Sequence, residues 1–95
     1  MKLKSVTKSP KAGKKWRATF ENEGREKHTD FGAAGMEDYT QHHDKERREH
    51  YRTRHKKDLD TDDPTRAGYL SWFLLWGEST SLQTNLASYR RRFHL

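Results

Sequence analysis

The sequence predicts a small α+β protein, in which a short N-terminal antiparallel β-meander of two or three strands is followed by three helices. Two patterns support this fold class. Apolar Trp16, Ala18 and Phe20 alternate with polar residues, which is typical of a half-buried strand. Towards the C-terminus apolar residues recur instead at helical spacing. Because the chain has 95 residues, we expect a single small domain.

Residues 15–34 are predicted to form a β-hairpin region. Its first strand runs over Lys15–Glu21, and Asn22-Glu23-Gly24 supplies a turn in which glycine can adopt positive φ. A more polar strand returns over Arg25–Phe31. Residues 1–14 are basic, and we expect either a flexible tail or, around Leu3 and Val6, one more short strand.

Residues 36–57 are predicted to form one charged, mostly exposed helix with acids in its first turn and cations in its last. An acidic linker follows over residues 58–63. Asp63 and Pro64 together indicate a helix start, as an N-cap residue followed by proline at the first helical position. Residues 64–95 then form two aromatic and apolar helices.

The densest apolar stretch is Tyr69–Trp76, which predicts either a central core helix or an exposed docking surface, with the core favoured. Thr80 and Gln83 match a capping box for the last helix. That helix carries an apolar stripe at i, i+4, i+7 and i+11, formed by Leu82, Leu86, Tyr89 and Phe93.

Charge gives the strongest functional signal, because 20 Lys and Arg against 14 Asp and Glu leave a net charge of +6. The cations gather near the N-terminus, on the charged helix and at the C-terminus. Such clusters bind phosphates and release counterions. We therefore predict a nucleic-acid partner, double-stranded DNA first, held by its backbone with little sequence preference. Base readout is less supported: a ribbon with Lys15, Arg17 and Thr19 outward or the long helix could enter a major groove, and nothing in the sequence selects between them. The predicted contact residues are Lys2, Lys4, Lys8, Lys11, Lys14, Lys15, Arg17, Arg47, Arg48, Arg52, Arg54, Lys56, Lys57, Arg90, Arg91 and Arg92.

Other chemistries lack their motifs. No cysteine is present, and the histidines of residues 42–55 lack the spacing of a helical zinc site. Asp58, Asp60 and Asp62 alternate like calcium ligands, but the glycine and glutamate of an EF-hand loop are missing. No nucleotide or catalytic motif occurs. We expect no enzyme activity, no metal and no cofactor. No apolar run reaches the length of a membrane span, and the N-terminus lacks a signal peptide's apolar stretch, so we expect neither membrane insertion nor secretion by its own signal.

Three strings carry a family resemblance: Thr29–Thr40 (TDFGAAGMEDYT), His42–Tyr51 (HHDKERREHY) and Asp63–Trp76 (DPTRAGYLSWFLLW). Over roughly Lys15–Trp76 the chain resembles a family of small basic proteins of unknown function encoded by large double-stranded DNA viruses. The resemblance implies a viral origin, a place in the virion or in the infected cell's nucleus or cytoplasm, and no catalytic residues. It leaves two roles open. One is binding and condensing the genome; the other is a minor capsid or virion structural role through contacts with other virion proteins or with further copies of itself.

Overall fold

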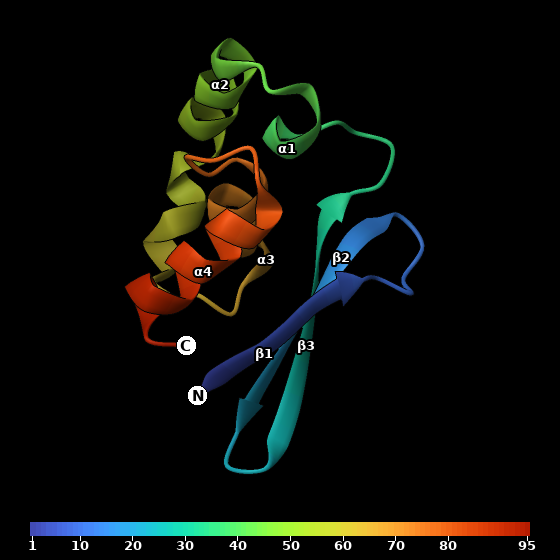
Figure 1. Ribbon diagram of the computed structural model, residues 1–95, viewed down its shortest axis with the longest axis vertical. Coiled ribbons are helices and arrows are strands. Elements are labelled where there is room, and N and C mark those ends of the chain that lie inside the picture. The colour runs from blue at the N-terminus through green and yellow to red at the C-terminus, as the bar shows by residue number, and fades with distance from the viewer.

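A three-stranded antiparallel sheet forms one side of the protein in the computed structural model, which describes residues 1–95 (Figure 1). The strands β1 (Lys2–Lys8), β2 (Lys14–Asn22) and β3 (Arg25–Ala33) are ordered β1-β2-β3. Together with the helices that follow, this sheet confirms the predicted α+β fold class. Residues 2–8 therefore form a strand, and the alternative of a flexible tail throughout residues 1–14 was wrong.

The helices follow in sequence and pack beside the sheet (Figure 1). They are α1 (Tyr39–His42), α2 (Lys45–His55), the 3₁₀ helix η1 (Lys56–Thr61), α3 (Ala67–Leu70), the π-helical turn η2 (Ser71–Leu75) and α4 (Leu82–Phe93). Since η2 continues α3 directly, residues 67–75 form one helical segment, which we call the apolar helix. No helix combines the length and the apolar character that a membrane crossing requires.

The predicted single helix over residues 36–57 is divided in two. His43 adopts left-handed backbone geometry (φ 56°) and ends α1. Asp44 then acts as the N-cap of α2, because its carboxylate accepts hydrogen bonds from the amides of Glu46 and Arg47 at 3.0 and 3.2 Å. The interruption has a local cause: a capping aspartate inside the expected helix starts a new one.

Three other boundaries also differ from prediction. Residues 58–63 are largely part of η1 rather than an irregular linker. Asp63 caps a turn, accepting from the amide of Thr65 at 2.9 Å, and the helix begins only at Ala67. The N-cap of α4 is Ser81, whose hydroxyl accepts from the Thr84 amide, so the predicted capping box one residue earlier was wrong.

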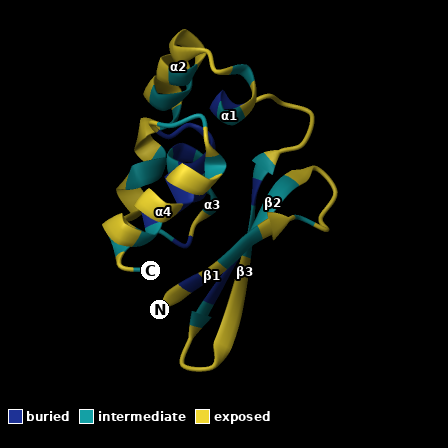
Figure 2. Ribbon diagram, viewed as in Figure 1, coloured by how far each residue is buried: buried dark blue, intermediate teal, exposed yellow.

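The core lies between one face of the sheet and α3, η2 and α4, where the buried residues gather (Figure 2). Leu3, Ala18, Phe20 and Phe31 contribute from the strands. The segment Tyr69–Trp76 supplies most of the rest, as all of its side chains except Ser71 and Phe73 are buried. This confirms that the densest apolar stretch belongs to the core. The predicted stripe on α4 also faces inward, with Leu86 and Tyr89 buried.

Two polar anchors join the sheet, the apolar helix and α4. The buried amide of Asn85 donates to the carbonyls of Leu74 and Ser79 at 3.0 and 2.8 Å and accepts from the Ser79 amide at 3.1 Å. Arg90 donates to the carbonyl of Leu3 at 3.0 and 3.1 Å. As a result, the end of α4 lies beside the beginning of β1 (Figure 1).

Candidate nucleic-acid interface

Many of the predicted contact cations are held by other parts of the protein. Arg48 and Arg52 point from α2 towards the end of the apolar helix, where their Nε atoms donate to the carbonyls of Gly77 and Trp76 at 2.6 and 3.1 Å. These carbonyls follow a helix end, where acceptors lack intrahelical partners. Burial and the neighbouring Arg48 lower the pKa of Arg52. The two arginines are therefore structural caps rather than a free cationic stripe.

The outer face of the sheet is also neutralised. Arg17 donates to both carboxylate oxygens of Asp30 at 2.9 and 3.1 Å, and this guanidinium lowers the pKa of Asp30 to about 2. Lys4 lies 2.6 Å from Glu26 and 3.4 Å from Glu21. Both outward cations, Lys4 and Arg17, are therefore paired with carboxylates of other strands.

The C-terminal cluster is largely occupied as well. Arg90 holds the β1 backbone, Arg91 donates to the Ser88 hydroxyl at 3.2 Å, and Arg92 lies over the Phe73 ring at 5.0 Å. In contrast, one group of predicted cations makes no side-chain hydrogen bond or ion pair: Lys2, Lys8, Lys11, Lys14, Arg54, Lys56 and Lys57.

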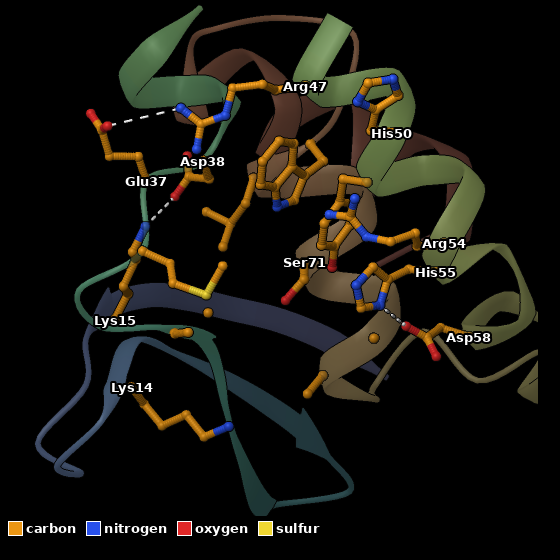
Figure 3. A pocket seen from close by; sticks show the side chains of 18 residues that line it. Lys14, Lys15, Glu37, Asp38, Arg47, His50, Arg54, His55, Asp58 and Ser71 are labelled. Atoms are coloured by element: carbon orange, nitrogen blue, oxygen red, sulfur yellow. Dashed lines mark hydrogen bonds and ion pairs between the residues drawn. The ribbon is translucent and has the colours of Figure 1, made fainter. Parts of the chain in front are cut away.

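Two of the unpaired cations, Lys14 and Arg54, line a groove of about 440 Å³ between the start of β2, the end of β3, α2 and the apolar helix (Figure 3). Lys14 and Lys15 line it from the sheet, and Arg47, His50 and Arg54 line it from α2. In the sequence, Lys8 and Lys11 come shortly before the lining residues of β2, and Lys56 and Lys57 come directly after those of α2. The groove thus brings together two members of the N-terminal cluster and two of the α2 cluster.

The acids in the groove have partners. The Lys15 ammonium lies 2.6 Å from Asp38, which is almost wholly buried and caps α1. Glu37 lies 4.0 Å from Arg47, and Asp58 lies 3.1 Å from Nδ1 of His55. Lys14 and Arg54 are the lining cations without an acidic partner, and the lining as a whole carries four Lys and Arg side chains against three carboxylates.

A column of three rings forms one part of the wall. Tyr51 stacks on Trp76 with centroids 4.3 Å apart and planes 6° apart, and His55 stacks on the other face of Tyr51 at 4.2 Å and 21°. Burial, with a smaller effect of Asp58, raises the pKa of Tyr51 to about 12. The His55 side chain ends the column and is 42% exposed.

Sequence reasoning missed the lining residues Tyr51, His55, Ser71 and Trp76. One signal was available, because Tyr51 and His55 are four residues apart and therefore adjacent on a helix. The stacking of Trp76 on Tyr51 could not be predicted from neighbouring residues, because Trp76 follows a helix that is distant in the sequence. No group of three His, Cys, Asp or Glu side chains in the protein is placed to hold a metal ion.

These observations define a small α+β domain with a cationic groove between its sheet and its second helix. Residues 4–55 match the family of unknown function DUF5754, and the chain belongs to that family. The matched segment contains the sheet, α1 and α2, and hence both cationic walls of the groove. No curated protein and no solved structure matches the chain. The viral origin expected from the resemblance stays a prediction.

Proposed function

We propose that the protein binds nucleic acid through the phosphate backbone, without sequence specificity. The observation that carries the proposal is the position of the unpaired cations. Lys14 and Arg54 line opposite sides of one groove, and neither has an internal acidic partner. Cations without an internal partner remain available to exchange small counterions for phosphates.

The proposal includes compaction of DNA, the role that the viral resemblance favours, in the virion or the infected cell. Compaction requires each protein to hold two stretches of chain at once. Exposed cations that do not line the groove and have no internal partner, such as Lys45 and Lys57, supply the second contact. The alternative structural role relied on Tyr69–Trp76 as a docking surface, and that segment is committed to the core.

The test is fluorescence anisotropy with short oligonucleotides of several unrelated sequences over a series of salt concentrations. We expect similar affinities for all sequences and a log–log fall of affinity with salt, with a slope of about −0.9 per phosphate neutralised on a duplex. Absence of binding at a low salt concentration of about 50 mM, where this electrostatic term is strong, would refute the proposal.

Paired variants locate the contact. Replacing Lys14 and Arg54 together by glutamine removes two charges from the groove, and we expect the salt slope to become shallower by about 2. The control replaces Lys2 and Arg25 by glutamine, which removes the same charge from exposed, unpaired sites outside the groove. If both double variants lose the same affinity, the groove is not the contact surface.

A further inference from the structure

The two elements shaped to enter a duplex groove carry a mixture of cations and acids, and the exposed cations of α2 are Lys45, Arg47 and Arg54. On α2, Arg48 and Arg52 turn inward to backbone carbonyls, while Glu46 and Glu49 stay on the exposed surface. On the outer face of the sheet, Arg17 is held by Asp30. Reading a duplex requires a helix or a two-stranded ribbon that presents its side chains to the base edges. Neither element therefore presents an uninterrupted row of free cations to a duplex.

The free charge lies instead along a concave surface. A volume of about 440 Å³ falls within the range of sites that enclose small organic ligands, about 300–1,000 Å³. A duplex cannot enter a groove of this size, whereas one nucleotide of an unpaired strand can. Lys14 lines this volume from the sheet side and Arg54 lines it from α2, so that one cation stands on each side of an enclosed nucleotide.

The ring column offers a surface for the base. Trp76 and His55 cover the two faces of Tyr51, and Trp76 is itself buried. A further ring can therefore extend the column only by stacking on His55. The His55 ring is held at its edge by Asp58, and both residues line the groove (Figure 3). Stacking of bases on aromatic rings beside a cationic track is how proteins bind single strands without sequence preference.

We propose that the groove receives an unpaired nucleotide of single-stranded nucleic acid, with its base stacked on His55 and its flanking phosphates at Lys14 and Arg54. This inference rests on the proposed function and narrows its ligand from nucleic acid in general to the single-stranded form. It departs from the double-stranded DNA that composition alone favours.

The experiment compares three ligands with equal numbers of phosphates per strand: a twelve-nucleotide oligothymidylate, a twelve-base-pair duplex and an abasic strand of twelve units. At the same salt concentration we expect the oligothymidylate to bind about five- to tenfold more tightly than the abasic strand, as one stacked base contributes. It should also bind more tightly than the duplex.

Two histidine variants test the stacking residue. His55→Ala should reduce the preference for the oligothymidylate over the abasic strand to less than about twofold. His50→Ala is the matched control, because His50 lines the same groove but is not part of the ring column, and it should keep the preference. Circular dichroism of both variants checks that the fold is retained. The ratio of the two affinities is insensitive to a uniform loss of folded protein.

The outcomes separate the two proposals. Equal or tighter binding of the duplex, equal binding of the abasic strand, or a full preference in His55→Ala would overturn this inference and leave nucleic-acid binding intact. If none of the three ligands binds at low salt, the proposed function fails and this inference fails with it.

Discussion

Replacing Asn85 by alanine removes the buried amide that fixes the junction between the apolar helix and α4. The side chain makes three hydrogen bonds, to the Leu74 carbonyl and to both backbone groups of Ser79. Each such bond contributes about 0.5–1.5 kcal/mol net, and the Leu74 carbonyl would lose this partner in a buried position. We expect a loss of about 2–3 kcal/mol from the free energy of unfolding.

For a domain of this size 1 kcal/mol corresponds to about 4–8 °C, so the expected fall in Tm is about 10–20 °C. Thermal and urea denaturation followed by tryptophan fluorescence measure it. Gln83→Ala is the control, because Gln83 is exposed on the same helix and makes no hydrogen bond, and its effect should stay within about 0.5 kcal/mol. A fall in Tm of less than about 3 °C for Asn85→Ala would refute the packing of this junction.

Three further predictions concern the glycines and two titrating groups. Gly32→Ala should destabilise by about 1–3 kcal/mol more than Gly24→Ala in urea denaturation, since both glycines have positive φ but only at Gly32 would the new methyl lie 2.8 Å from Leu75. Burial raises the pKa of Tyr51 to about 12, so its contribution to stability should be present below pH 10 and lost as pH rises from 10 to 12. Because burial also raises the pKa of Tyr69 and Tyr89, ultraviolet difference titration of Tyr51→Phe should show one late-ionising tyrosine fewer than the unmodified protein. The pKa of Asp30 is lowered from 3.8 to about 2, so its ionised carboxylate stabilises the folded protein fully above pH 3.8. This stabilisation is lost as the pH falls through about 2. Asp30→Asn should therefore flatten the dependence of unfolding on pH between these two values.

The sheet was readable from the sequence because its signals are local. Alternation over Trp16, Ala18 and Phe20 places these side chains on the inner face. The Glu23-Gly24 pair, with φ of 53° and 79°, forms the tight two-residue turn that such residues favour. The buried helix was also readable, since a segment apolar on nearly all sides has few alternatives to the core.

Which cations are free on the surface could not be predicted from the sequence, because this depends on tertiary contacts. Nothing near Arg48 or Arg52 in the sequence shows that the carbonyls of Gly77 and Trp76 will arrive beside them. Composition treats all cations as equivalent, whereas the fold assigns some to internal acceptors and leaves others for a partner. The groove exists only once β2, α2 and the apolar helix are assembled.

The bond from Arg90 to the Leu3 carbonyl has a consequence for how the chain acquires its structure. It joins residues 87 positions apart, and the core that it borders is completed only by Leu86 and Tyr89. During synthesis the apolar helix can cover the sheet before α4 is made, but the side of the apolar helix that packs on Leu86 and Tyr89 stays uncovered until α4 leaves the ribosome. Such late, distant closure slows folding and exposes the nascent strands to aggregation. A chain interrupted before residue 86 should thus accumulate as an aggregation-prone species rather than as a smaller folded domain.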